Sequence, residues 1–448
     1  MKSSIEDTTV EAEKLKVLFT DNKIDEFLSR FKDQVDLEAT AKEPRALLRK
    51  REIKTAFDLL RLSLAYAACD WSLRLVGSWC TIIGIGSLSD VAVLNRLRHC
   101  RLWLGKLVAL VLQTHRLAIT SKPGLRLRLM DGTSLSQPGS AGTDWRLHLS
   151  FDLEAACIDG VELTNAQTGE TFAHVPIRAG EIRIGDRGYA FVKSLESVLE
   201  SQGAFIVRIS WHNLPLNDER AAKLDLLHLL RQKNTAEPIT EYPVWLRKST
   251  LHAPLRLLVT QLPQEVGDKA RAALRRKHQK KGTALSKGSL FAAGFIMVLS
   301  NLSMTDWSAK EIFKLYRFRW QIELAIKRLK SLLKLESLRA QDAELVQVYL
   351  LAKLLAALLV DNLVQKIQRA CPLWFQNTHS PISLWRLTAL LFEVLLTQIR
   401  GVITLERLLA TLPKLRRFLC DSPRKRIQQL AQARSLLTKI MSPALVLS

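Results

Sequence analysis

The chain has 448 residues and carries 66 lysines and arginines against 43 aspartates and glutamates, a formal net charge of +23 at pH 7. This length allows two or three domains with a sizeable core. Because the basic residues recur along the whole chain, they favour a polyanionic partner over a long contact surface. A membrane surface is the alternative, but neither a signal peptide nor a basic amphipathic helix is evident at the start of the sequence.

Cysteine usage and hydropathy narrow the class further. The six cysteines are scattered without a Cys-x2-Cys pair, which argues against a zinc finger or a disulfide scaffold and is typical of reduced thiols. The most apolar run, Leu345 to Val360, is interrupted by Gln347 and Lys353 and is short for a bilayer span, so we expect a buried helix. These features predict a soluble, cytoplasmic protein that faces nucleic acid.

The first part of the chain, residues 1 to about 118, is predicted to be helical. An apolar helix is broken by Gly84-Ile85-Gly86, and Ser87 is a suitable N-cap for a second helix that runs to about Leu97. This is the outline of a helix-turn-helix, in which Arg96 would add positive charge to the second helix. A helical hairpin that only packs has the same outline, so both interpretations stay open.

From Gly124 the hydrophobic period changes to two. Strands are predicted at residues 125–131, 145–152, 157–164, 181–186 and 204–210, with a helix over about 191–202. The first strand ends in Asp131 and the fourth in Asp186. Three strands, a strand ending in an aspartate, a helix and a further strand fit a mixed α/β core of the ribonuclease-H type.

Residues 211–306 interrupt this order with three strand-like segments and a basic loop at Arg271–Lys287, and Leu-rich helices follow later. We therefore predict four regions. They are a helical N-terminal DNA-binding domain (1–118), a ribonuclease-H-like catalytic core (119–210 and 307–345), a β-rich insertion domain (211–306) and a helical C-terminal region that is a candidate for dimerisation (346–448).

A polar stripe follows the insertion. On one α-helix the spacing Tyr-x2-Arg-x3-Glu-x6-Lys puts four side chains within a fan of roughly 60°, those of Tyr316, Arg319, Glu323 and Lys330. A separate apolar stripe on the same helix must face a core. One carboxylate between cations on a half-buried helix suits a site that holds a metal and phosphates. An ordinary amphipathic helix with solvated charges is the alternative.

Three acids form the candidate centre. In an α/β sheet, reactive side chains converge at strand ends, so Asp131 and Asp186 can lie side by side beneath the helix of Glu323. Three carboxylates repel one another unless a divalent cation offsets them, and such a set suits Mg²⁺ or Mn²⁺. Two such ions could clamp the attacking and leaving oxygens of a phosphoryl transfer. Each acid alone is weak evidence, because an aspartate at a strand end is usually a turn residue.

The combination of these motifs resembles the bacterial DDE transposases, and the Tyr-Arg-Glu-Lys signature resembles that of the insertion-sequence-four family. The resemblance covers about Leu125 to Leu338 by motif and order, through Asp131-Gly132-Thr133, Asp186-Arg187-Gly188-Tyr189, Leu299-Ser300-Asn301-Leu302 and the stripe from Tyr316 to Lys330. The long interval between Asp186 and Glu323 leaves room for the β-rich insertion domain that this family has there.

The resemblance implies that Asp131, Asp186 and Glu323 bind Mg²⁺, with Mn²⁺ as a substitute. Tyr316, Arg319 and Lys330, with Arg187, would hold DNA phosphates. It implies cut-and-paste transposition, in which water frees a 3′-hydroxyl at the element end and that hydroxyl joins target DNA, in some members through a hairpin. The implied partners are double-stranded DNA, as terminal inverted repeats and target, and a second copy of the chain in a synaptic homodimer. The implied location is the bacterial cytoplasm, at the nucleoid.

Further DNA contacts are expected from aromatic and basic residues. A flipped hairpin base needs an aromatic platform, for which Trp320 is the first candidate. The family's second tryptophan is absent, and Phe295 stands on the corresponding strand. The basic cluster Arg275-Arg276-Lys277 is suited to the DNA backbone. Two other functions stay open: a catalytically silent DNA-binding regulator on the same fold, and a ribonuclease-H-like nuclease such as a junction resolvase.

Overall fold

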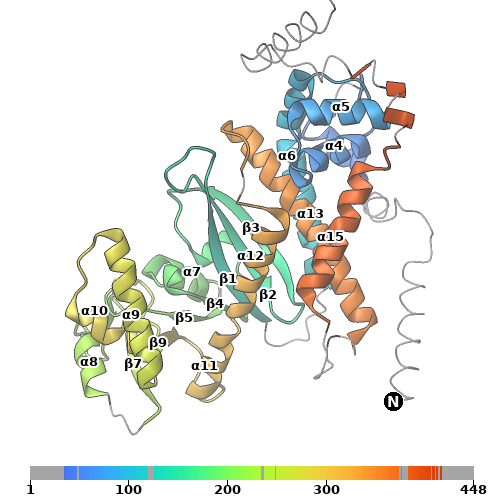
Figure 1. Cartoon of the computed structure of the whole chain (residues 1–448). Coiled ribbons are helices and arrows are strands. Elements are labelled where there is room, and N and C mark those ends of the chain that lie inside the picture. Colours follow the sequence, from blue (N-terminus) through green and yellow to red (C-terminus); the bar gives the residue numbers. More distant parts are fainter. Residues whose placement is uncertain are drawn as a thin grey trace, which may run out of the picture. The chain divides into compact units, whose positions relative to one another are not determined.

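The computed structural model describes residues 35–47, 50–118, 126–233, 237–247, 249–336, 338–372, 375 and 382–404, with short pieces at 406–408, 410–411 and 414–415 (Figure 1). The ends of the predicted N-terminal and C-terminal regions therefore lie outside the described residues. The chain divides into two compact units. The larger contains Gly105–Val346 and Lys353–Glu393, and the smaller contains the described parts of Lys23–Leu104, Gln347–Ala352 and Val394–Ser448.

The larger unit is built on one nine-stranded sheet of order β3-β2-β1-β4-β5-β9-β8-β7-β6. Its strands are β1 (Arg126–Leu135), β2 (Trp145–Asp152), β3 (Cys157–Asn165), β4 (Glu181–Gly185), β5 (Ala204–Arg208), β6 (Leu216–Asn217), β7 (Ile239–Leu246), β8 (Leu255–Gln261) and β9 (Phe295–Ser300). The pairs β1–β4 and β4–β5 are parallel, and the other pairs are antiparallel. Helix α7 (Val192–Glu200) connects β4 to β5. The mixed α/β class predicted from the sequence is confirmed.

Residues 211–306 extend this sheet. Strand β9 pairs with β5 on one side and with β8 on the other, so the segment continues the same hydrogen-bonded layer. It also contains helices α8 (Leu226–Gln232), α9 (Gln264–Lys281) and α10 (Lys287–Ala292). The predicted basic loop was wrong, since most of it is α9. The alanines, arginines, lysines and glutamines of this stretch are strong helix formers, and Gly282 ends the helix in the left-handed region at φ +62°.

Two helices follow the sheet where one was predicted. Helix α11 (Ala309–Arg317) ends before Arg319, and α12 (Trp320–Leu333) begins directly after it. The continuous helical stripe from Tyr316 to Lys330 was therefore wrong, because the chain turns between its first two members. The apolar stripe on α12 is confirmed: Ile322, Ala325, Ile326, Leu329 and Leu333 are buried. Helix α12 packs against β1.

A long apolar helix, α13 (Ala343–Ala370), follows. Within the part of the chain that the structure describes, it is the one helix whose length and composition would allow it to cross a membrane. Most of its apolar stretch is buried inside the protein. This burial confirms the helix predicted over Leu345–Val360. A further helix, α15 (Leu384–Arg400), lies near the end of the described residues.

The described part of the N-terminal region, from residue 35 to residue 118, is helical as predicted, with α3 (Leu37–Lys42), α4 (Ala56–Ala68), α5 (Leu73–Ile83) and α6 (Asp90–Ala118). The second helix of the predicted helix-turn-helix differs in two respects. It is capped by Ser89, whose hydroxyl accepts a hydrogen bond from the Ala92 amide at 3.1 Å, and not by Ser87. It also continues for 29 residues, because buried side chains recur at helical spacing well beyond Leu97. Arg96 lies within this helix.

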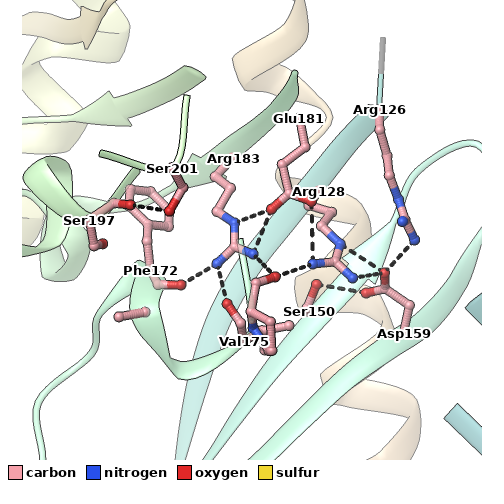
Figure 2. Close-up of polar contacts among 12 residues, drawn as sticks. Arg126, Arg128, Ser150, Asp159, Phe172, Val175, Glu181, Arg183, Ser197 and Ser201 are labelled. Atoms are coloured by element: carbon pink, nitrogen blue, oxygen red, sulfur yellow. Dashed lines mark hydrogen bonds and ion pairs between the residues drawn. The ribbon is translucent and has the colours of Figure 1, made fainter. Parts of the chain in front are cut away.

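A buried ionic network links β1, β3 and β4 (Figure 2). Arg128, three residues before Asp131 on β1, points to the other face of the strand and donates to Asp159 at 2.5 Å. Arg183 on β4 pairs with Glu181 at 2.6 Å, and its guanidinium also donates to the carbonyl of Val175 at 2.7 Å. These ions are almost fully buried, and Arg183 ties the loop that precedes β4 to the strand itself.

Candidate active site

Strand register places the two aspartates together. Leu129 of β1 lies opposite Ile184 of β4 in a parallel pair, so Asp131 and Asp186 continue this register two residues further along each strand. Asp186 follows the end of β4 directly, as predicted. Asp131 does not end its strand, because β1 continues to Leu135 through its antiparallel pairing with β2. Pairing with β4, rather than the end of β1, therefore determines where Asp131 meets its partner.

Asp131 has the most perturbed carboxylate of the site. Burial, with the negative charges of Asp186 and Glu170, raises its pKa to about 7. A hydrogen bond from the Gly132 amide at 2.9 Å and the positive charge of Arg319 lower it. Two acids from other segments, Asp186 and Glu170, therefore act electrostatically on Asp131, together with Arg319.

Asp186 is held by its own turn. Its carboxylate oxygen accepts a hydrogen bond from the Gly188 amide at 2.7 Å and caps the short 3₁₀ helix η2 (Arg187–Tyr189). The carboxylate is thereby fixed beside Asp131 through backbone contacts, so neither aspartate depends on a long side chain for its position.

The helical part of the site is arranged differently. Arg319, at the break between α11 and α12, forms an ion pair with Glu323, and its guanidinium lies 5.9 Å from the ring centroid of Tyr316. The same guanidinium interacts electrostatically with Asp131. Arg319 therefore acts on Glu323 and on Asp131 at once. Lys330, about two helical turns beyond Glu323, pairs instead with Glu336 at 2.6 Å.

Two residues of the site were not predicted from the sequence. Arg208, the last residue of β5, interacts electrostatically with Arg187 and with Tyr316, and Arg187 also interacts with Asp186. The guanidinium Nε of Arg208 is buried without a hydrogen-bond partner among the described residues. An arginine that directly follows the buried run Phe205-Ile206-Val207 was the available signal in the sequence.

The second unpredicted residue is Glu170, in the loop between β3 and β4. Burial raises its pKa, as does the charge of Asp186, whereas Arg146 and His174 lower it. Burial also raises the pKa of the neighbouring Tyr189 phenol, with Glu170 as the next contribution. No motif in the sequence distinguishes Glu170 from the other acids of its region.

The remaining residues predicted to contact DNA differ in how exposed they are and in which unit they belong to. Trp320 begins α12 beside Arg319 and is 58% exposed, so its ring is accessible. Phe295 is only 6% exposed and packs against Phe291, so the structure places it in the core. The cluster Arg275-Arg276-Lys277 is exposed on α9. Arg96 belongs to the smaller unit.

The donor chemistry of this site fits a hard divalent cation, since every candidate ligand is a carboxylate oxygen. In residues 126–233 and the other described ranges, however, no three acidic, histidine or cysteine side chains come close enough to hold a metal ion already. Glu323, the acid predicted on the helix, is paired with Arg319 in this structure.

The sequence of the chain is similar to those of known transposases. The family described as "Transposase DDE domain" matches residues 122–359. The chain is 36% identical over 335 residues to the putative transposase InsL of insertion sequence element IS186A from Escherichia coli, covering 74% of this chain and 90% of the relative. It is 36% identical over 336 residues to the Escherichia coli transposase of IS421, covering 74% and 91%.

More distant relatives include the transposase of IS231F from Bacillus thuringiensis subsp. israelensis, 22% identical over 54% of this chain and 57% of the relative. A cryo-EM structure of a piggyBac transposase synaptic complex with hairpin DNA aligns with 92% of this chain and 86% of that chain, at 10% identity and a TM-score of 0.40. The chain belongs to the DDE transposase family, and is thus a DDE-type transposase enzyme. Enzymes of this family use divalent metal ions.

Proposed function

We propose that this protein is a transposase of the insertion-sequence-four type, which moves its own element by cut-and-paste chemistry with Mg²⁺, or Mn²⁺ as a substitute. The observation that carries the proposal is the parallel register of β1 and β4. It brings Asp131 beside Asp186 at one sheet edge, and α12, which bears Glu323, packs against β1. We propose that the core containing these residues has a ribonuclease-H-like fold.

Asp131, Asp186 and Glu323 would hold the divalent ions, which supply Lewis-acid stabilisation of the attacked phosphate and an activated water. Hydrolysis breaks the phosphodiester bond at the element end and leaves a 3′-hydroxyl. That hydroxyl then attacks a phosphate of target DNA, and the target strand is the leaving group. No bond to the protein forms, so Tyr316 serves as a contact and not as a nucleophile.

The cationic residues around the acids are suited to bind DNA phosphates. Arg319 interacts electrostatically with Asp131, and Arg187 interacts with Asp186. A scissile phosphate would enter between these charges. Tyr316 and Lys330 extend this contact along α11 and α12. When a phosphate binds Arg319, Glu323 loses its ion-pair partner and becomes free for a cation. DNA binding and metal binding are thereby coupled through one guanidinium.

Outside this centre, α9 provides a second DNA surface. Its exposed Arg275, Arg276 and Lys277 are suited to the phosphate backbone, which they would position without reading sequence. Trp320, exposed next to Arg319, is suited to stack on a flipped base of a hairpin intermediate. Phe295 lies in the core, so it gives no support to a second aromatic platform. We propose a synaptic homodimer on paired inverted repeats, in the cytoplasm at the nucleoid.

The test uses duplexes that carry the terminal repeats flanking the coding sequence, with target DNA and Mg²⁺. Asp131→Asn, Asp186→Asn and Glu323→Gln should each abolish cleavage and strand transfer while end binding in a mobility-shift assay is retained. Glu154→Gln, an exposed acid in the turn between β2 and β3, is the matched control and should keep full activity.

Cleavage retained by any of the three variants would remove that residue from the centre. Wild-type protein that binds ends without cutting them would identify a silent regulator. Products that are cut but never joined would identify a nuclease.

A further inference from the structure

Glu170 lies against the backbone beside both catalytic aspartates. A Cβ atom added at Gly132, the neighbour of Asp131, would come within 2.9 Å of its Oε1 atom. A Cβ atom at Gly188 would come within 1.9 Å of its Oε2 atom and 3.1 Å of Asp186 Oδ1. Because Gly132 and Gly188 have no side chain, the Glu170 carboxylate fits between Asp131-Gly132 and Asp186-Arg187-Gly188.

The loop that carries Glu170 is firmly anchored. Arg183 donates to the carbonyls of Val175 and Pro176 at 2.7 and 2.6 Å, which are contacts of the buried network (Figure 2). The Phe172 amide donates to the Ser194 hydroxyl at 3.0 Å, and His174 bonds the Gly169 carbonyl at 2.8 Å. The position of Glu170 is thus set by backbone contacts on both sides of it.

This position is electrostatically unfavourable in the protein alone. Glu170 adds a third negative charge to the pair Asp131–Asp186, and within the described ranges it forms neither a hydrogen bond nor an ion pair. Like charges placed together in a partly buried site are destabilising unless an opposite charge compensates them. Arg146 and His174 lie within electrostatic range of Glu170, but neither forms an ion pair with it in the described residues. Arg319, which acts on Asp131, is already engaged by Glu323.

A second observation points to the same place. Tyr189 is completely buried, stacks on Phe172 with ring centroids 4.9 Å apart, and has no hydrogen-bond partner for its hydroxyl in the described residues. That hydroxyl lies within electrostatic range of Glu170, Asp131 and Asp186. Buried hydroxyls are normally satisfied, so an unpaired donor facing three acids indicates a site whose carboxylates rearrange when a ligand arrives.

We propose that Glu170 is a fourth acid of the cation site, which raises the affinity of the Asp131–Asp186 pair for a divalent ion, and that the Tyr189 hydroxyl donates to a carboxylate oxygen left free by that ion. This inference rests on the proposed catalytic site and extends it. Glu170 acts from the loop between β3 and β4, whereas Glu323 acts from α12.

The experiment measures Mn²⁺ binding to the full chain without DNA, by electron paramagnetic resonance of the free ion and by the thermal unfolding midpoint with and without Mn²⁺. Glu170→Gln should weaken Mn²⁺ affinity about tenfold, as is typical for groups that support a metal site. Its midpoint without metal should equal or exceed that of the wild type, because one repulsive charge is gone. Glu154→Gln is the control and should change neither value.

A second variant keeps the charge and moves it. Gly188→Ala places a methyl group where Glu170 Oε2 lies, and should also weaken Mn²⁺ binding while end binding persists. Tyr189→Phe should also weaken Mn²⁺ binding, but by a smaller factor. If Glu170→Gln lowers the metal-free midpoint but leaves Mn²⁺ affinity unchanged, Glu170 only supports its loop and the inference is overturned.

Asp131→Asn and Asp186→Asn distinguish a failure of the Glu170 inference from a failure of the proposed catalytic site. If both lose Mn²⁺ binding while Glu170→Gln and Gly188→Ala retain wild-type affinity, the catalytic site stands and the role of Glu170 is wrong. If both aspartate variants bind Mn²⁺ as the wild type does, the proposed site itself is wrong.

Discussion

The acids on strands and the acid on a helix are held in contrasting ways. Asp131 and Asp186 are set side by side by the register of β1 and β4, and each carboxylate accepts a hydrogen bond from a nearby backbone amide. Glu323 stands on α12, 30% exposed, and pairs with Arg319. In the proposed centre the two aspartates are therefore in place before any ligand binds, whereas Glu323 would have to exchange Arg319 for the metal ion.

The strongest test of this contrast removes the support of the strand side. Arg183→Ala leaves Glu181 buried without its closest cation, and we expect a loss of about 3–5 kcal/mol, as for other broken buried ion pairs. The full chain's denaturant midpoint should fall accordingly. Arg178→Ala, an exposed arginine in the same loop, should stay within about 0.5 kcal/mol of the wild type. Equal midpoints for the two variants would show that the network does not support the sheet.

A smaller effect is expected on the helical side. Arg319→Ala frees Glu323, so Mn²⁺ affinity of the DNA-free protein should rise, by up to about fivefold for a partly exposed ion pair worth ~1 kcal/mol. Binding to pre-cut ends should weaken in the same variant, because a phosphate contact is lost. Isothermal titration of Mn²⁺ and of end DNA measures both. A fall in both affinities would contradict the exchange of Glu323 between Arg319 and metal.

The smallest effect concerns Lys330, whose present partner is Glu336. Lys330→Ala should weaken binding to pre-cut ends and lower the slope of log affinity against log salt by about 1, the value for one lost phosphate contact. Lys327→Ala, on an exposed position of the same helix, is the control. An unchanged slope for Lys330→Ala would remove it from the phosphate-binding residues.

The sequence predicted the strand side well because period-two alternation and tight turns are local signals. The strands before Asp186 and the helix after it follow from such patterns. The helical side was harder, since the break at Phe318–Arg319 contains neither glycine nor proline. The high charge of residues 271–287 led to the prediction of a loop where α9 forms, although its residues are good helix formers.

Contacts between distant segments could not be predicted. Glu170, Arg208 and the core position of Phe295 depend on which strands and loops meet in the folded sheet, and one sequence carries no local sign of that. The regional boundaries proposed at 118, 210, 306 and 345 stay predictions.

The most direct test of the central claim maps the metal position on the protein. Fe²⁺ bound in place of Mg²⁺ in the complex with end DNA generates hydroxyl radicals that cut the nearby backbone. We predict cuts next to Asp131, Asp186 and Glu323, all lost in Asp186→Asn. Cuts elsewhere, or cuts that persist in that variant, would contradict a single centre shared by strand and helix.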